Sequence, residues 1–182
     1  MQNKSNQFAE SLLPFIVDID NGVVEKITHS LNKCSTNGGK IVLFGNGGSA
    51  SIASHLAVDF SKAVGCRSIT FSDPSLLTCY SNDYGYDQCY AKCVQHYVDK
   101  ADICIFISSS GKSPNIINAA KTAKENGNAI ITLSGFDQSN ELRTLGDTNI
   151  WINSSNYNVL ETVHQIWLLA VVETMRLSKV ED

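Results

Sequence analysis

The chain has 182 residues, of which 43% are hydrophobic and 18% are charged, and its formal net charge is −4. This balance excludes a disordered or fibrous protein, and the 14 Lys and Arg residues are too scattered to form a basic face for nucleic acid or for an anionic membrane. We therefore expect one globular domain over residues 1–182 with one extra terminal element.

The chain shows no sign of export or of membrane insertion. Its N-terminal segment lacks the basic and then apolar pattern of a signal peptide, and no apolar stretch approaches a membrane-spanning length. The six cysteines form no CxxC pair, and a chain of this size does not need disulfides. These features predict a cytoplasmic protein with reduced thiols.

The N-terminal part of the sequence predicts two helices and then a strand. Apolar residues recur at helical spacing in residues 6–20 and 22–37. A short apolar run, Lys40 to Phe44, follows, and then come a glycine-rich loop, Gly45 to Ser49, and a helical segment from Ala50 to about Ala63. The succession of strand, glycine loop and helix is typical of the first unit of a doubly wound α/β sheet.

The same succession returns later in the chain. Ile103 to Ile107 predicts a buried strand, Ser108 to Ser113 a Ser/Gly loop, and Pro114 to Asn126 a helix with proline in its first turn. Other patterns predict strands at Ser68 to Phe71, Ala129 to Leu133 and Asn149 to Ile152, and helices at Ser75 to Val98, interrupted near Asn82 to Gly85, and at Gln138 to Leu145.

The last predicted helix runs from Asn158 to about Leu177. Its apolar residues, among them Val159, Val163 and Trp167, occupy too many faces for a helix at the surface of a single chain. We expect this helix to pack against a second subunit as well as against its own sheet.

The loop Ser108 to Ser113 has the composition of a phosphate site. Backbone N–H groups at a helix N-terminus converge on an anion, and the helix dipole favours its charge. A serine-rich helix cap without a ligand is the simpler alternative, but a second loop at the end of another predicted strand weighs against it. Gly111 lets the backbone turn close to a ligand. The predicted phosphate ligands are Ser108, Ser109, Ser110 and Ser113.

The first loop, Gly45 to Ser49, differs from the common nucleotide-binding loops. It lacks the Gly-Lys-Ser/Thr of a Walker A sequence, and its glycines do not have the GxGxxG spacing of a dinucleotide site. A short loop with polar side chains suits the hydroxyl groups of a sugar better than a pyrophosphate.

Four segments together resemble the successive signatures of the sugar isomerase (SIS) domain family, and within it the phosphoheptose isomerase branch. They occur in the order of that family, and the resemblance covers nearly the whole chain, including the N-terminal helices. The segments are Gly45 to Ser49, Ser81 to Tyr86, Ile107 to Asn115 and Leu133 to Gly135.

The resemblance implies a three-layer α/β/α fold with a five-stranded parallel sheet, and a homotetramer whose central bundle includes the helices of residues 1–37, with active sites at subunit boundaries. It implies the conversion of sedoheptulose 7-phosphate to D-glycero-D-manno-heptose 7-phosphate for lipopolysaccharide or capsule biosynthesis. The residues that match substrate-binding positions are Asn46, Gly47, Gly48, Ser49, Asp83, Ser108, Ser109, Ser110 and Ser113.

The chain departs from the family where protons are expected to move. A His and a Glu of the family correspond to His55 and Asp59, and a Gln and a His on the last helix correspond to Glu161 and Leu169. Leucine cannot transfer a proton. Glu161 lies within one helical turn of His164, so Asp59, Glu161 and His164 are the predicted catalytic residues. His55, Asp59 and Glu161 could instead hold Zn²⁺ if they converge; no other cofactor is predicted.

Three functions remain open at this stage. The first is an aldose–ketose isomerase acting on sedoheptulose 7-phosphate. The second is a non-catalytic SIS module, either a sugar-phosphate sensor or a regulator that binds a protein such as a replication initiator, which Leu169 would explain. The third is isomerisation of a different sugar phosphate with Glu161 as the base.

Overall fold

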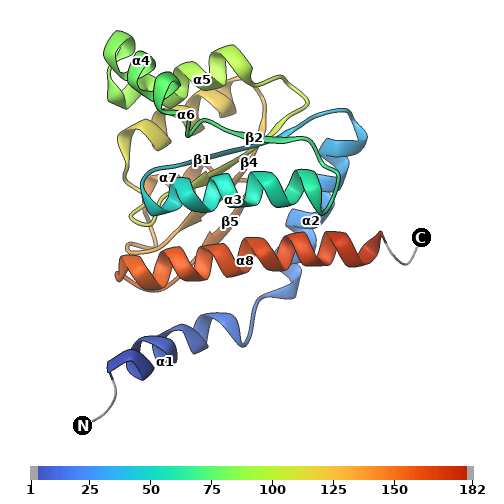
Figure 1. The fold of residues 1–182 in the computed structure, drawn as a ribbon, viewed down its shortest axis with the longest axis vertical. Coiled ribbons are helices and arrows are strands. Elements are labelled where there is room, and N and C mark those ends of the chain that lie inside the picture. The colour runs from blue at the N-terminus through green and yellow to red at the C-terminus, as the bar shows by residue number, and fades with distance from the viewer. Residues whose placement is uncertain (1–3, 180–182) are drawn as a thin grey trace.

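The computed structural model describes residues 4–179 and shows one sheet of parallel strands between two layers of helices (Figure 1). The strand order, β2-β1-β3-β4-β5, confirms the predicted doubly wound, five-stranded sheet. The strands are β1 (Ile41–Gly45), β2 (Ser68–Thr70), β3 (Ile103–Ile107), β4 (Ala129–Ser134) and β5 (Thr148–Trp151).

The helices of the described residues follow the predicted order. They are α1 (Lys4–Ile16), α2 (Asn21–Thr36), α3 (Gly48–Lys62), α4 (Pro74–Tyr84), α5 (Cys89–Tyr97), α6 (Pro114–Glu125), α7 (Glu141–Leu145) and α8 (Tyr157–Ser178), with a 3-10 turn, η1 (Tyr86–Gln88), before α5.

Alternating side chains of the buried strands form two separate apolar cores. Ile41 and Leu43 of β1 pack with α2, α3 and α8, whereas Val42 and Phe44 pack with α5 and α6. A strand points successive side chains to opposite faces, so a continuous apolar run is what a sheet covered on both sides requires. The apolar runs in the sequence therefore correspond to the buried layer of the sheet.

Helix α3 begins at Gly48, earlier than the predicted start at Ala50. Ser49 consequently lies in the first turn of the helix and not in the loop before it. Gly47 precedes the helix with a φ of 53°, a left-handed conformation that glycine adopts without the steric cost of a Cβ atom. The first turn of α3 therefore starts directly at the end of β1.

Helix α7 is shorter than predicted, since it begins at Glu141 and not at Gln138. The Asp137 carboxylate accepts a hydrogen bond from the Ser139 backbone N–H at 2.9 Å, which closes a turn before the helix. Asn140 then caps α7 through its side-chain oxygen. Local side-chain bonds thus compete with helix formation in this segment.

The interruption predicted near Asn82 to Gly85 is confirmed. Helix α4 ends at Tyr84, Gly85 has a φ of 84°, and η1 leads into α5. The left-handed conformation at Gly85 breaks the helical path.

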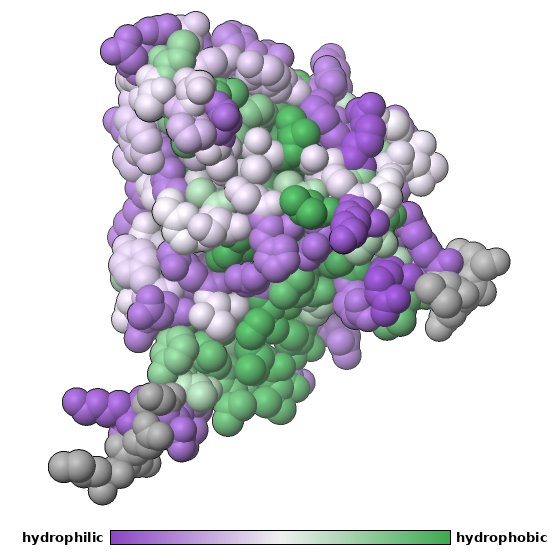
Figure 2. Space-filling model, in the orientation of Figure 1, coloured by the Kyte–Doolittle hydropathy of each residue, from purple (hydrophilic) through white to green (hydrophobic). Residues whose placement is uncertain are grey.

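Helix α1 extends away from the sheet and lies against α8 (Figure 1). The Trp167 indole on α8 donates a hydrogen bond to the Phe15 carbonyl oxygen at 2.9 Å. Phe8, Leu13 and Val17 remain exposed beside this contact, and Figure 2 shows a broad hydrophobic area in this part of the molecule. Packing of α1 and α8 against a second subunit remains a prediction. Within residues 4–179, no helix is long and apolar enough to cross a membrane.

The sheet topology brings the two predicted loops together. Strands β1 and β3 are parallel neighbours, and Gly45 pairs with Ile107 at their carboxyl ends. From β1 and β3 the sheet grows outward in opposite directions. The crevice at such a reversal, beyond the carboxyl ends of the strands, is where open α/β sheets bind ligands.

Candidate active site

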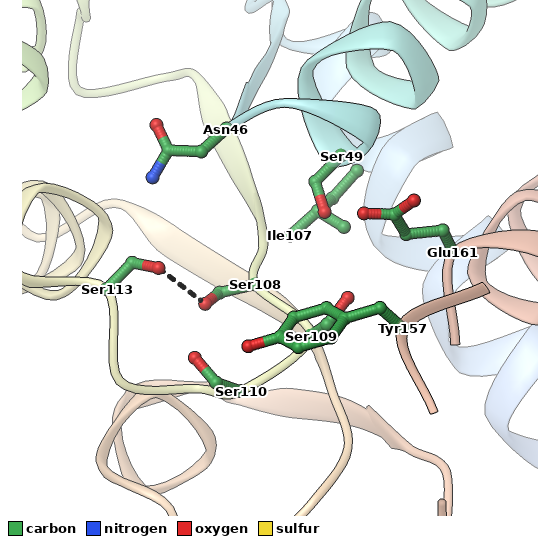
Figure 3. A pocket seen from close by; sticks show the side chains of 9 residues that line it. All are labelled: Asn46, Ser49, Ile107, Ser108, Ser109, Ser110, Ser113, Tyr157 and Glu161. Atoms are coloured by element: carbon green, nitrogen blue, oxygen red, sulfur yellow. Dashed lines mark hydrogen bonds between the residues drawn. The ribbon is translucent and has the colours of Figure 1, made fainter. Parts of the chain in front are cut away.

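A cavity of about 110 Å³ lies in this crevice (Figure 3). Its walls come from the β1–α3 junction, from the loop between β3 and α6, and from the first turns of α8. The lining residues are Asn46, Ser49, Ile107, Ser108, Ser109, Ser110, Ser113, Tyr157 and Glu161. Six of the nine predicted substrate-binding residues, and one of the three predicted catalytic residues, therefore border one cavity.

The serine loop presents hydroxyl groups to this cavity. Ser109 is 5% exposed, and its Oγ has no hydrogen-bond partner among the described residues. The Ser108 hydroxyl donates to Ser113 Oγ at 3.2 Å, which leaves the Ser113 proton available. Burying a hydroxyl without a partner costs free energy, so the unpaired Ser109 oxygen indicates a place for a ligand.

Helix α6 adds its N-terminus to the same wall. Ser113 is its N-cap residue, but the Ser113 side chain makes no capping hydrogen bond, and Pro114 occupies the first turn. The Ile116 N–H is bonded instead to Asn115 Oδ1 at 3.0 Å, so Asn115, and not the Ser113 side chain, caps this helix end. The positive end of the α6 dipole faces the loop, as an anion site requires.

The path of the serine loop depends on Gly111 and Asn140. Gly111 has a φ of 64°, and a Cβ atom there would lie 2.0 Å from Asn140 Oδ1. The buried Asn140 amide donates to Ser134 Oγ at 3.0 Å and to the Asp137 carbonyl oxygen at 2.8 Å. Asn140 thereby joins the loop after β4 to the serine loop, and only glycine leaves room for it.

A pair of amides joins the first loop to α6. Asn46 Nδ2 donates to Asn115 Oδ1 at 2.9 Å, and Asn115 Nδ2 donates back to Asn46 Oδ1 at 3.0 Å. The Tyr86 hydroxyl also donates to Asn46 Oδ1 at 3.0 Å. These bonds hold Asn46 at the edge of the cavity.

Glu161 lies against the beginning of α3. A Cβ atom added to Gly48 would lie 2.2 Å from Glu161 Oε2, so the carboxylate occupies the space that a side chain at residue 48 would need. The N-terminus of a helix favours a negative charge. Because Gly48 has no side chain, it leaves room for the Glu161 carboxylate. Glu161 reaches the cavity from α8 (Figure 3).

His55 and Asp59 lie outside the cavity, farther along α3. His55 Nε2 is 3.2 Å from Asp59 Oδ2, and the Gln165 amide on α8 lies 3.0 Å from His55 Nδ1. Because the amide donates, Nδ1 accepts and the proton sits on Nε2, toward Asp59. Side chains of α3 and α8 therefore do meet, but the α8 residue that contacts His55 is Gln165 and not Glu161.

The predicted metal set does not assemble within the described residues. His55 follows Gly48 by seven positions, which places it about 10 Å along the helix axis from the turn that Glu161 contacts. Accordingly, no group of three or more His, Cys, Asp or Glu side chains in residues 4–179 is arranged to hold a metal ion. His55, Asp59 and Glu161 do not form a zinc site within one chain.

His164 is fully buried, and it lies in the core and not on the cavity wall. Its Nε2 is 3.2 Å from the Ser134 carbonyl oxygen, so Nε2 carries the proton, and Nδ1 has no partner among the described residues. Burial lowers the pKa of His164 to about 4, partly offset by the bond to Ser134. His164 therefore does not face the cavity that Glu161 borders.

Asp83 lies outside the cavity, whereas two residues that were not predicted line it. Asp83 is exposed on α4, where it accepts a hydrogen bond from Asn82, and it does not line the cavity. Ile107 and Tyr157 line the cavity without having been predicted. Ile107 is the last residue of β3, so its position follows from the strand boundary. Tyr157 precedes the predicted start of α8, and no sequence signal linked it to the serine loop.

Comparisons with known proteins identify the family of the chain and solved structures of the same fold. A family model described as the SIS domain matches residues 6–135. The phosphoheptose isomerase of Fusobacterium nucleatum is 33% identical over 154 residues, which cover 82% of this chain and 79% of that protein. The enzyme of the same name from Salmonella paratyphi B is 30% identical over 177 residues, covering 94% and 91%. A solved phosphoheptose isomerase from Neisseria gonorrhoeae matches with a TM-score of 0.83 at 30% identity, covering 94% of this chain and 96% of that one.

Proposed function

The chain belongs to the sugar isomerase (SIS) domain family, and from this premise we propose that it is a phosphoheptose isomerase. It interconverts sedoheptulose 7-phosphate and D-glycero-D-manno-heptose 7-phosphate, for lipopolysaccharide or capsule biosynthesis. The single observation that supports this most strongly is the cavity itself, which is bordered by Ser109 of the serine loop, with its unpaired buried hydroxyl, and by one carboxylate, that of Glu161.

The phosphate lies in the serine loop. Ser109 Oγ and Ser113 Oγ supply hydroxyl donors, and the N-terminus of α6 supplies the positive end of its dipole. Asn46 and Ser49, on the opposite wall, face the sugar hydroxyls. A carboxylate repels a phosphate dianion, so the sugar carbons, and not the phosphate, lie beside Glu161.

Glu161 is the base. Isomerisation removes a proton from the carbon next to the carbonyl group, forms an enediol, and returns the proton to the neighbouring carbon. Among the described residues that line the cavity, Glu161 is the only Asp, Glu, His or Lys. Leu169 on the same helix packs against the apolar core and offers no proton. The exchange of protons between the two oxygens therefore relies on water or on substrate hydroxyls.

The proposal extends to the domain and to its oligomeric state. One SIS domain spans residues 1–182, and the helices of residues 1–37 join a bundle in a cytoplasmic homotetramer. The exposed apolar side chains of α1 beside α8 support such a bundle. Asp83, together with the His55 and Asp59 pair, could border an active site only where subunits meet, since all three lie outside the cavity of their own chain.

The experiment is to follow aldose formation from sedoheptulose 7-phosphate, in D₂O as well as in H₂O, with the wild-type chain and with Glu161→Gln. We expect deuterium to enter the product from solvent, and kcat of the variant to fall by about 10²–10⁴-fold with little change in KM. Glu173→Gln is the matched control, because Glu173 is an exposed carboxylate on the same helix that pairs with Arg176.

Two results would contradict the proposal. Full activity of Glu161→Gln would place the base elsewhere. Binding of the sugar phosphate without turnover by the wild-type chain would favour the non-catalytic sensor that Leu169 suggests. Turnover of another sugar phosphate in a substrate panel, but not of sedoheptulose 7-phosphate, would keep the mechanism and change the substrate.

A further inference from the structure

Tyr157 is the one aromatic side chain on the cavity wall, within the described residues. It is the first residue of α8, and its backbone is held in place because the Asn156 side chain caps the helix by accepting from the N–H groups of Asn158 and Val159. Glu161, one turn later, lines the same cavity. The two side chains therefore project from one face of the helix.

The Tyr157 ring is supported on one side only. Its centroid lies 5.1 Å from that of Phe136, at an interplanar angle of 55°. Phe136 has a φ of 53°, and its N–H donates to the Ser154 carbonyl oxygen at 2.8 Å. Such a backbone conformation is costly for a residue with a side chain, so the surroundings hold Phe136, and with it the ring of Tyr157, in a defined place.

The hydroxyl end of Tyr157 is free. Tyr157 is 55% exposed, and no hydrogen bond joins its hydroxyl to another described residue. In Figure 3 the ring lies beside Ser109, its hydroxyl points to the side of Ser108 and Ser110, and Glu161 lies beyond the other end of the ring. The phenol thus faces the part of the cavity assigned to the phosphate.

The size of the cavity suits one end of a sugar phosphate. Its volume of about 110 Å³ is well below the roughly 300–1,000 Å³ of pockets that enclose a whole drug-sized ligand. The Tyr157 hydroxyl and the hydroxyls of Ser108 and Ser110 lie near one another on the cavity wall. Several hydroxyl donors around a small space suit a compact anion that accepts hydrogen bonds.

We propose that Tyr157 completes the phosphate pocket, with its hydroxyl donating to a phosphate oxygen and its ring separating the phosphate from the Glu161 carboxylate. This inference rests on the proposed function and adds a binding residue to it. A phenol is a hydrogen-bond donor, and a bond to an ionised oxygen is stronger than one between neutral groups. The ring also keeps the dianion from meeting a like charge.

The test compares Tyr157→Phe with the wild-type chain by calorimetric titration with sedoheptulose 7-phosphate and, separately, with inorganic phosphate. We expect Kd for both probes to rise about fivefold to twentyfold, toward the lower end for bonds to charged groups because the site is half exposed. In turnover assays KM rises and kcat stays within about twofold. Tyr97→Phe is the matched control, since Tyr97 is 44% exposed on α5 and does not line the cavity.

The outcomes separate this inference from the function on which it rests. If Ser109→Ala weakens binding and Tyr157→Phe does not, the role of Tyr157 is wrong while the phosphate pocket stands. If Tyr157→Phe lowers kcat at unchanged KM, the hydroxyl serves proton transfer, and the phosphate assignment is overturned. If the wild-type chain binds neither probe, the proposed function fails, and the inference fails with it.

Discussion

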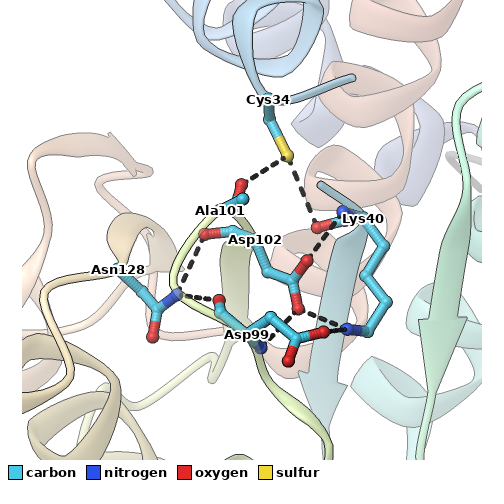
Figure 4. Close-up of polar contacts among 6 residues, drawn as sticks. All are labelled: Cys34, Lys40, Asp99, Ala101, Asp102 and Asn128. Carbon is cyan, nitrogen blue, oxygen red and sulfur yellow. Dashed lines mark hydrogen bonds and ion pairs between the residues drawn. The ribbon is translucent and has the colours of Figure 1, made fainter. Parts of the chain in front are cut away.

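The two ends of the same parallel sheet use polar residues in opposite ways. At the carboxyl end, the cavity leaves Ser109 Oγ without a protein partner. At the amino end, polar groups around Lys40 and Asp102 are joined to one another (Figure 4). Both ends are rich in hydrogen-bonding side chains, so their composition alone does not show which end has a structural role and which could bind a ligand.

The amino-end cluster is built around the buried Asp102 carboxylate. It accepts hydrogen bonds from the Lys40 and Asp99 backbone N–H groups, at 2.8 and 2.7 Å, and pairs with Lys40 Nζ at 2.5 Å. Burial opposes the charge of Lys40, but hydrogen bonds to Asp102 and Asp99 outweigh it and raise the pKa of Lys40. The Cys34 thiol donates to the Lys40 and Ala101 carbonyl oxygens, and burial raises its pKa.

The role of a polar group is therefore indicated by its partners more than by its identity. Asp102 has its acceptor sites filled and joins the starts of β1 and β3, which stabilises the fold. Ser109 has an open site at the end of β3. One exception stands at the amino end, where the Asn128 amide donates to the Asp99 and Asp102 carbonyl oxygens while its Oδ1 is unpaired.

The largest expected effect is at the amino end. Asp102→Ala removes the buried partner of Lys40, whose side chain is 14% exposed, and leaves two backbone N–H groups without their acceptor. We expect the free energy of unfolding, measured with urea, to fall by about 3–5 kcal/mol. Asp99→Ala is the control, because the Asp99 side chain is 81% exposed, and it should cost below about 1 kcal/mol. Equal losses would mean that the cluster is not organised around Asp102.

His164 is a buried titratable group near the carboxyl end of the sheet, so stability at this end depends on pH. Its pKa in the folded chain is about 4, below the ordinary value of roughly 6.5. As the pH falls below 6.5, His164 becomes protonated in the unfolded chain but stays neutral in the folded chain. Stability is thus highest above pH 6.5 and is lost as the pH falls toward 4, by about 2 kcal/mol between pH 6.5 and 5.

Urea unfolding of the wild-type chain and of His164→Gln at pH 7 and pH 5 measures this. Glutamine can still donate to the Ser134 carbonyl oxygen but does not titrate. We expect a smaller loss between the two pH values in the variant. An identical pH dependence would show that other groups cause the acid sensitivity.

The smallest change in stability is expected for Ser109, at the carboxyl end. Ser109→Ala removes a hydroxyl that has no protein partner, so the free energy of unfolding should change by less than about 0.5 kcal/mol. Binding of sedoheptulose 7-phosphate should weaken about tenfold, or roughly 1.4 kcal/mol. Thr28→Val is the matched control, because Thr28 Oγ1 is also buried and unpaired but lies on α2, away from the cavity. A similar loss of binding in both variants would contradict a specific role for Ser109.

The order of the elements could be predicted from the sequence, because each depends on local patterns. Continuous apolar runs mark β1, β3 and β4, and the segments that follow β1 and β3 carry Asn46 and the serines that line the cavity. The resemblance of four segments to the SIS family is also a property of the sequence, and the family match agrees with it.

The meeting of particular side chains was decided by the tertiary structure. Helical spacing allowed Glu161 to act with His164, yet α8 directs Glu161 to the cavity and His164 into the core. Tyr157 joined the site only because α8 begins beside the serine loop. Periodicity predicts which face of a helix is apolar. It does not predict how the helix is rotated, or where it begins, relative to a loop that is distant in the sequence. Those depend on packing among segments far apart in the chain, and for this reason the cavity could be assembled only in three dimensions.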